Sequence, residues 1–312
     1  MFYGIISSLL FLYSIISPNF HFKLPELTSL SAPVSQDSKA IIVVKYGGNA
    51  MTNPELQQAV MAQVAALHGD TCQIVLVHGG GPEINKLLEL ARIKSEFIDG
   101  HRKTTGESMY FVQLALRGEV NGTLVRLLNH INAPAVGLSG KDGGLVTAIK
   151  RYHLRNASAA GEAAEKVDIG YVGDVDTINP ALLHTLLEQG FLPVLAPIAI
   201  GKDGHDYNIN ADIFAGVIAA ALKADAYISL TNVDGLYRDF EDKSSRITET
   251  TRADLKSFIE NSAEGGMLPK LESMLHALEN GVAAAHIING TRPGALQEQL
   301  AGGTRYGTKI TA

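Results

Sequence analysis

The sequence predicts an α/β fold: a three-layer αβα sandwich with a mostly parallel central sheet. Strand-like runs alternate with helical patterns along residues 41–312, as in folds whose helices connect parallel strands. Two early runs, Ile41–Val44 and Ile74–Val77, are apolar throughout, which is typical of strands buried on both faces. Glycines follow both runs closely, and ligands bind where the carboxyl ends of such strands meet. The sequence therefore predicts an αβα fold and a ligand site at the carboxyl ends of its parallel strands.

The elements expected in the first two thirds of the chain follow from apolar periodicity and turn residues. Asn53 suits the cap position of a helix, and Pro54 suits its first turn. Residues 97–105 are polar and turn-like, and residues 145–175 form an excursion of strands and turns around a small-residue loop at 157–164. The expected strands are 41–45, 72–77, 135–138, 145–149, 170–175 and 192–196, and the expected helices are 53–67, 83–92, 107–131 and 178–188.

The last third of the chain continues the alternation. Asp203 and Gly204 predict a turn, and residues 207–212 lead into an alanine-rich helix that ends near Lys223. A polar turn is expected at 231–235. The remaining expected elements are strands at 226–230 and 284–288 and helices at 251–260, 267–280 and 294–301.

The composition is that of an ordinary globular protein: of 312 residues, 46% are hydrophobic and 19% are charged. The formal net charge is −6 and no basic stripe is visible, so nucleic acid is not expected as a partner. An anionic substrate must then be bound by a few locally placed cations and amides. Cys72 is the only cysteine, which excludes an intrachain disulfide and a cysteine-based zinc cluster and fits a reducing compartment. We expect Cys72 in the core.

Residues 1–40 are expected to form a leader separate from the folded domain at 41–312. Phe2–Ile16 is apolar but too short for a membrane-spanning helix. No lysine or arginine precedes Lys23, unlike the start of a secretory signal. A targeting leader, which includes organellar import, and a start foreign to the native chain both stay open, whereas membrane anchoring is disfavoured. Apart from import, a cytoplasmic location is expected.

The residues at the predicted sheet edge indicate an anion site. Lys45 ends the first strand, and Gly47–Gly48 and Gly79–Gly81 can turn bare backbone N–H groups toward a ligand. A helix begins after the second glycine run, so its amino end faces the same edge. Lys270 follows two glycines and a proline that mark another helix start, which makes it a candidate second cation. Phosphoryl transfer fits, because it asks a protein mainly for positioning and positive charge.

Other nucleotide and hydrolase signatures are missing or incomplete. Gly140-Lys141 is followed by Asp142 rather than Ser or Thr, so there is no Walker-type loop, and no strand precedes the spaced glycines of a dinucleotide fold. His78–Gly81 resembles the oxyanion loop of esterases, but the sequence contains no G-x-S-x-G nucleophile turn. Taken singly, the polar candidate residues also have ordinary explanations. Lys270 could be a solvated lysine and Asp212 an acid at the amino end of a helix. Arg102 could be a surface arginine and Asn208 a turn residue.

Eight motifs in a fixed order resemble those of the amino acid kinase family. They cover residues 41–312, which is essentially everything after the leader. They are Val44-Lys-Tyr-Gly-Gly-Asn-Ala-Met51, His78-Gly-Gly-Gly-Pro82, Asp99-Gly-His-Arg102, Ala135-Val-Gly-Leu-Ser-Gly140, Tyr207-Asn-Ile-Asn-Ala-Asp212, Leu230-Thr-Asn-Val-Asp-Gly235, Gly265-Gly-Met-Leu-Pro-Lys270 and Gly307-Thr-Lys-Ile310. The resemblance implies the three-layer fold, with an acyl-amino-acid-binding half at 41–200 and an ATP-binding half at 201–312.

The resemblance implies a catalytic role for three residues. Lys45 and Lys270 would flank the transferred phosphoryl group and offset the charge that develops on it. Asp212 would hold the two lysines in place rather than act as a base, because a carboxylate substrate is already ionised at neutral pH. The family's cofactors would be ATP and Mg²⁺, with the ion carried on the ATP phosphates and no metal ligand expected from the protein.

The resemblance also implies the binding residues. Arg102 would pair with a substrate carboxylate in bidentate fashion, and Asn208 would bind the α-carboxylate or acetamido group. Gly79 and Gly80 would contact the substrate through backbone amides. The residues expected at the phosphates and the nucleotide are Gly47, Gly48, Thr231, Asn232, Asp234 and Gly235.

Within the family, the motifs are most similar to those of enzymes that phosphorylate the γ-carboxylate of N-acetyl-L-glutamate in arginine biosynthesis. His101-Arg-Lys103 departs from the usual pattern around the arginine, so a kinase of carrier-protein-linked aminoadipate stays open as an alternative. A carbamate kinase-like enzyme and a non-catalytic ATP- or acyl-glutamate-binding regulator stay open too. Residues 1–40 do not resemble the helix that joins dimers into hexamers in some members, so we expect a homodimer acting on small molecules.

Overall fold

The computed structural model describes residues 39–51, 53–69, 72–98, 101–155, 165–262, 266–301 and 306–312. The predicted leader, apart from residues 39 and 40, and the small-residue loop at 157–164 lie outside these ranges. Within them, no helix has both the length and the apolar character needed to cross a bilayer.

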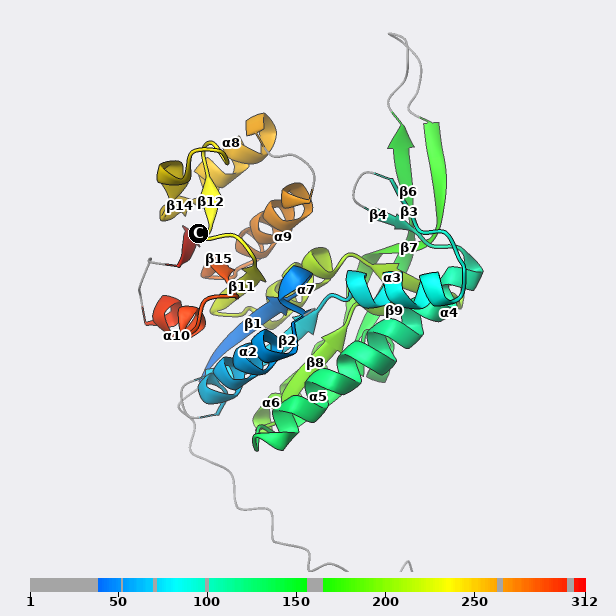
Figure 1. Cartoon of the computed structure of the whole chain (residues 1–312), viewed down its shortest axis with the longest axis horizontal. Coiled ribbons are helices and arrows are strands. Elements are labelled where there is room, and N and C mark those ends of the chain that lie inside the picture. The colour runs from blue at the N-terminus through cyan, green and yellow to red at the C-terminus, as the bar shows by residue number, and fades with distance from the viewer. Residues whose placement is uncertain are drawn as a thin grey trace, which may run out of the picture. The chain divides into compact units, whose positions relative to one another are not determined.

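The central sheet has eight strands in the order β14-β16-β15-β11-β1-β2-β8-β5 (Figure 1). All neighbouring strands pair in parallel except β15 and β16, which are antiparallel. The strands in chain order are β1 (Ala40–Tyr46), β2 (Cys72–His78), β5 (Ala135–Ser139), β8 (Leu192–Ala196), β11 (Ala226–Thr231), β14 (Glu249–Thr251), β15 (Ala284–Asn289) and β16 (Gly307–Thr311). The prediction of a mostly parallel sheet is confirmed.

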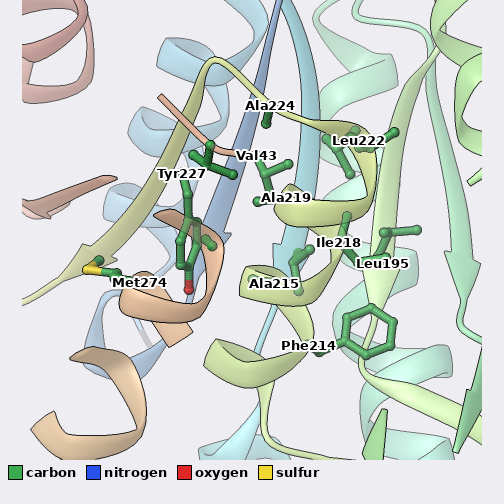
Figure 2. Close-up of a cluster of buried hydrophobic side chains, with 14 of the residues drawn as sticks. Val43, Leu195, Phe214, Ala215, Ile218, Ala219, Leu222, Ala224, Tyr227 and Met274 are labelled. Atoms are coloured by element: carbon green, nitrogen blue, oxygen red, sulfur yellow. The ribbon is translucent and has the colours of Figure 1, made fainter. Parts of the chain in front are cut away.

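Helices cover both faces of this sheet because the side chains of its strands alternate between two cores. Val44 of β1 packs in one core with residues of α2 (Pro54–Leu67) and α5 (Asn121–His130). Val43 packs in the other core with residues of α7 (Ala211–Leu222) and α9 (Met267–Glu279), and Figure 2 shows it facing α7. The helices on each face and the sheet between them make the three predicted layers.

The remaining helices lie close to their predicted positions. Asn53 caps α2 as expected, since its side chain accepts a hydrogen bond of 3.0 Å from the N–H of Leu56. The long predicted helix at 107–131 is continuous but consists of α4 (Gly106–Gln113), the π-helical segment η2 (Leu114–Val120) and α5. The other helices are η1 (Gly48–Met51), α3 (Gly81–Leu90), η3 (Asp142–Gly144), α6 (Ala181–Glu188), η4 (Lys243–Ser245), α8 (Arg252–Ser262) and α10 (Ala295–Leu300).

The excursion at 145–175 belongs to a four-stranded barrel that the sequence did not reveal. The barrel is closed in the order β10-β7-β6-β9, from β6 (Val146–Arg155), β7 (Glu165–Ile178), β9 (Ile198–Gly201) and β10 (Asp206–Ile209). Because β7 runs through Ile178, the start predicted for the helix at 178–188 was wrong, and α6 begins at Ala181. The turn predicted at Asp203–Gly204 is present between β9 and β10.

The segment at 97–105 forms strands, so the prediction of a plain polar turn was wrong. β3 (Glu96–Ile98) and β4 (His101–Lys103) pair antiparallel as a hairpin. Backbone hydrogen bonds make this pairing, so polar side chains do not prevent it. The N–H of Thr104 donates to the carbonyl of Ile169 at 3.0 Å, which joins the hairpin to β7. A second small pair consists of β12 (Leu236–Tyr237) and β13 (Arg246–Ile247).

Candidate active site

The carboxyl ends of the central parallel strands bring the predicted anion-binding residues together. Lys45 of β1 pairs in register with Ser229 of β11, and Tyr46 pairs with His78 of β2. The two glycine turns that follow β1 and β2 therefore lie side by side. The N–H of Gly79 donates to the carbonyl of Tyr46 at 2.8 Å, and a Cβ on Gly79 would lie 3.7 Å from Gly47 Cα.

Lys45, Asp212 and Lys270 form one cluster at this edge, which we call the charge triad. Lys45 Nζ lies 3.1 Å from Asp212 Oδ2, and Lys270 Nζ lies 2.7 Å from Asp212 Oδ1. One carboxylate is thus shared between two ammonium groups, one oxygen to each. Lys270 Nζ also donates to Ser229 Oγ at 2.8 Å, and Ser229 Oγ donates to Asp212 Oδ1 at 3.3 Å.

The local sequence explains how the helices deliver Asp212 and Lys270. Asn210 caps α7, and its side-chain oxygen accepts from the N–H groups of Asp212 and Ile213 at 2.9 and 3.3 Å. Asp212 thereby lies in the first turn of the helix, where the helix dipole favours a carboxylate. Gly216 lets α7 approach α9, because a Cβ there would lie 2.5 Å from the carbonyl oxygen of Ser273. A larger residue at 216 would push Lys270 away from Asp212.

The charge triad is nearly dry, and its charges do not cancel. The side chains of Lys45, Lys270 and Asp212 are 9%, 10% and 13% exposed. Burial acts to raise the pKa of Asp212, but attraction to Lys270 and Lys45 outweighs it and holds this pKa well below its usual range. Burial, together with repulsion from Lys45 and against the attraction of Asp212, lowers the pKa of Lys270 to about 8. Two cations and one anion leave an excess positive charge that favours an anionic ligand.

Two glycines of the turns after β1 and β2, Gly47 and Gly80, leave little room for a side chain. A Cβ on Gly47 would lie 3.0 Å from Lys45 Nζ, and a Cβ on Gly80 would lie 2.6 Å from Leu116 Cδ2. Gly48 has a φ of 76°, which favours glycine. Gly80 is the residue before α3, where the first N–H groups of the helix have no partner inside the helix. The turns thus present N–H groups beside Lys45.

Arg102 is buried in β4 and turned toward the amino end of α3. Its Nη1 donates to Ser95 Oγ, and its Nη2 lies 3.4 Å from the carbonyl oxygen of Gly81. Its guanidinium lies over the Phe97 ring, with 4.6 Å between Cζ and the ring centroid. Lys103 points to the other face of β4 and pairs with Glu96 at 3.3 Å, a carboxylate that also lies 3.9 Å from Lys94 Nζ. The structure therefore separates Arg102 from the charge next to it in sequence.

Asn208 precedes Asp212 in the chain, and the residues after β11 follow it. Asn208 is half-buried in β10, where it pairs with Val172 of β7 and Ile198 of β9. Thr231 ends β11, and its hydroxyl lies 3.4 Å from the side-chain oxygen of the exposed Asn232. β10 leads directly into α7, so Asn208 is four residues from Asp212.

The Asp234 carboxylate is bound to the protein itself. Asn289 Nδ2 donates to its Oδ1 at 2.6 Å, and Arg292 Nη2 lies 3.4 Å from its Oδ2. The hydrogen bond from Asn289, with help from Arg292, lowers the pKa of Asp234. Gly235 has a φ of 130°, and a Cβ there would lie 2.5 Å from Thr308 Oγ1. These two residues therefore shape the turn.

Two residues of the site were missed in the sequence: Ser229 and Asn210. Ser229 is a hydroxyl in the otherwise apolar run of β11, and this interruption was a readable signal. Asn210 precedes a long apolar helix, as cap residues do. No cluster of three or more His, Cys, Asp or Glu side chains suited to a metal ion occurs in the part of the chain that the structure describes.

The chain belongs to the amino acid kinase family, whose family model matches residues 40–289. Among individual relatives, it is 42% identical over 278 residues to the acetylglutamate kinase of Heliobacterium modesticaldum, covering 89% of this chain and 94% of the relative. It is also 42% identical over 272 residues to the acetylglutamate kinase of Desulfitobacterium hafniense, covering 87% of this chain and 91% of the relative.

Solved structures show the same fold. The smu.665 protein of Streptococcus mutans UA159 is 30% identical with a TM-score of 0.66, and the match covers 87% of this chain and 98% of that one. Carbamate kinase from Giardia lamblia bound to AMP-PNP is 16% identical with a TM-score of 0.63, over 88% of this chain and 99% of that one. The second likeness shows the fold alone.

Replacing Asp212 tests how much the shared carboxylate stabilises the fold. Asp212→Asn leaves Lys45 and Lys270 buried without a counter-ion, so we expect the free energy of unfolding at pH 7 to fall by about 3 kcal/mol. Urea unfolding measures it. As the pH drops below about 4, the ordinary pKa of an unfolded aspartate, wild type should lose this advantage, because the unfolded chain then takes up the proton that folded Asp212 refuses.

Asp206→Asn is the matched control for this variant. Asp206 pairs with Lys141 at 3.0 Å, but the two side chains are 28% and 34% exposed. Its loss should cost less than about 1 kcal/mol, as for other hydrated ion pairs. Equal losses in both variants would contradict a special role for the buried carboxylate.

Proposed function

We propose that the chain transfers the γ-phosphoryl group of ATP to the γ-carboxylate of N-acetyl-L-glutamate, the kinase step of arginine biosynthesis that makes N-acetyl-L-glutamyl 5-phosphate. The observation that carries this proposal is the charge triad, in which one buried carboxylate holds two ammonium groups at the glycine-lined sheet edge. Membership of the amino acid kinase family and relatives named acetylglutamate kinase at 42% identity support the choice of reaction and acceptor.

In this proposal the two lysines act on the transferring phosphoryl group. Lys45 comes from β1 and Lys270 from α9, so they can contact the group from two directions and offset the charge of the transition state. Asp212 fixes both ammonium groups and stays ionised, because its pKa is held low. No base is needed, since the attacking carboxylate carries no proton near pH 7. Transfer is direct, from donor oxygen to acceptor oxygen, without a covalent enzyme intermediate.

We assign the acceptor to residues 41–200 together with Asn208. Arg102 would pair with a carboxylate of N-acetyl-L-glutamate, and its burial against Phe97 holds the guanidinium in one orientation. Gly79 and Gly80 would donate backbone N–H groups to the acceptor. Asn208 would bind its α-carboxylate or acetamido group.

We assign ATP to residues 201–312 together with the first glycine turn. Gly47 and Gly48 would donate backbone N–H groups to its phosphates. The turn of Thr231, Asn232, Asp234 and Gly235 would hold the nucleotide, with Asp234 acting through its backbone because Asn289 and Arg292 occupy its carboxylate. Mg²⁺ would supply charge neutralisation as part of MgATP, which suits a site with two protein cations and no acidic ligand cluster among the described residues.

The alternative acceptors receive less support. A carrier-linked aminoadipate was suggested by the extra charge of Lys103, but that lysine pairs with Glu96 and points away from Arg102. A carbamate acceptor rests on a likeness at 16% identity, which shows the fold alone. A silent regulator has no need of the whole charge triad.

We further propose a cytoplasmic homodimer. Tyr110 in α4 and Leu114 in η2 lie one helical turn apart, and they are 61% and 43% exposed. Large apolar side chains grouped on one helix face favour contact with another protein surface. The single buried cysteine, Cys72, fits a reducing compartment.

ADP release tests the function directly. Protein lacking residues 1–38 would receive MgATP with N-acetyl-L-glutamate and, in parallel, glutamate, aspartate or N-acetylaminoadipate. We expect turnover that strongly favours N-acetyl-L-glutamate, with the acyl phosphate trapped as a hydroxamate. Lys45→Ala and Lys270→Ala should fold normally and lose turnover by orders of magnitude. Wild-type turnover in either variant, or no preference among acceptors, would contradict the proposal.

The pH dependence of kcat/KM for MgATP should report Lys270. This lysine must be charged to stabilise the phosphoryl group, and its pKa of about 8 means that the charge is lost as the pH rises through that value. We therefore expect kcat/KM to decline above pH 8, measured at saturating N-acetyl-L-glutamate. Lys270→Arg, which keeps its charge at high pH, should lose this alkaline decline. An unchanged decline in the arginine variant would assign the titration to another group.

Arg102→Ala should mainly raise the KM for N-acetyl-L-glutamate. We expect an increase of about 10-fold or more, the scale of a lost charged hydrogen bond, with a smaller effect on kcat. Lys103→Ala is the control, because this lysine is the neighbour of Arg102 on the other face of β4. A normal KM in Arg102→Ala would move the carboxylate site elsewhere.

A further inference from the structure

His78 is a fully buried imidazole at the carboxyl end of β2, and the proposed mechanism does not use it. It directly precedes Gly79 and Gly80, which are assigned above to the acceptor. Side chains of β2 alternate between the two faces of the sheet, and Leu76 packs in the core that contains residues of α5. His78 points to the same face, where its ring meets Asn121 of α5.

The Asn121 amide can adopt only one orientation. Its Oδ1 accepts a hydrogen bond of 2.9 Å from Arg117 Nη1. Its Nδ2 lies 2.9 Å from the carbonyl oxygen of Val194 and 3.4 Å from that of Leu138, and carbonyls only accept. A reversed amide would set oxygen against two carbonyls and nitrogen against a guanidinium. The atom 3.1 Å from His78 Nε2 is therefore the donor nitrogen.

This orientation fixes the tautomer of His78. Because Asn121 Nδ2 donates, His78 Nε2 must be the nitrogen without a proton. Burial, opposed by the hydrogen bond to Gly79, lowers the pKa of His78 to about 4, so near pH 7 the ring is neutral and carries one proton. That proton is on Nδ1, which lies 2.7 Å from the carbonyl oxygen of Gly79 and donates to it.

We propose that His78 is a positioning residue that aims the N–H of Gly80 at the acceptor substrate. The inference rests on the proposed function, in which Gly79 and Gly80 bind that acceptor. A trans peptide unit is planar, and its C=O and N–H point in opposite directions. Holding the Gly79 carbonyl against the ring therefore turns the Gly80 N–H away from the ring. Among the described residues, no backbone carbonyl accepts a hydrogen bond from this N–H in the turns, loops and caps.

The glycine turn needs such a constraint because it has no side chains of its own. Glycine tolerates backbone angles that other residues avoid, so the peptide between Gly79 and Gly80 can rotate at little steric cost. Rotation would replace the N–H by a carbonyl oxygen, which repels a carboxylate or phosphoryl group. The hydrogen bond from His78 Nδ1 stabilises the orientation that leaves a donor. Arg117 orients the Asn121 amide, and Asn121 in turn fixes the tautomer of His78.

Two amide substitutions separate positioning from filling of space. In His78→Asn the side-chain nitrogen can take the place of Nδ1 and donate to the Gly79 carbonyl. In His78→Gln the amide reaches the place of Nε2 and leaves that carbonyl without its donor. We expect kcat to fall by about 10²-fold in His78→Gln, the scale of one lost preorganised donor, and His78→Asn to keep most of it. Thermal unfolding of both variants shows whether activity merely follows stability.

The ¹⁵N chemical shifts of the His78 ring provide a readout besides activity. They should show a neutral ring with its proton on Nδ1 in the full-length wild type, with the signal assigned by its loss in either variant. A proton on Nε2 would overturn the proposal, as would equal activity of the two variants. Wild type that is inactive on N-acetyl-L-glutamate would instead contradict the proposed function. In that case the ring measurement still decides the tautomer.

Discussion

The sharing of one carboxylate between two ammonium groups is the interaction on which the site depends. Lys45 and Lys270 carry like charges in a nearly dry place, and such a pair is unfavourable without a counter-ion. Asp212 supplies it, with one oxygen for each lysine. This contact also constrains the fold, because β1, α7 and α9 must lie close enough together for the side chains of Lys45, Asp212 and Lys270 to meet. The close approach at Gly216 and the cap at Asn210 serve that demand.

Around the charge triad, the candidate site combines backbone N–H groups from the glycine turns with the side chain of Arg102. The turns after β1 and β2 offer N–H groups, and a Cβ at Gly47 or Gly80 would crowd Lys45 or Leu116. Arg102 stands on a hairpin that is tied to the barrel at Thr104 rather than built into the central sheet. In the proposed function, the transferred phosphoryl group contacts the central sheet edge, while a carboxylate of the acceptor contacts Arg102 on this separate hairpin. Such a division lets one fold serve different acceptors.

The main sheet was predictable because its strands are apolar runs, and Lys45 and the glycines follow those runs directly. The barrel and the β3–β4 hairpin were not, because short strands joined mainly by backbone hydrogen bonds leave little pattern in the side chains. Ser229 escaped notice although it interrupts an apolar strand. The contact of Lys45 with Asp212, 167 positions later, cannot be read from spacing, since it depends on which strands are neighbours. Family motifs named these residues, and the geometry explains why they occur together.

The place of β1 in the sheet has a consequence for how the chain is made. β1 lies between β2 and β11, so one of its neighbours is close behind it in the sequence and the other begins at Ala226. During synthesis, one edge of this apolar strand stays unpaired until most of the chain has left the ribosome. An open strand edge is a template for wrong pairing. The polypeptide thus passes through a long interval in which a central strand of its sheet is exposed to wrong pairing, and chaperones have reason to bind it there.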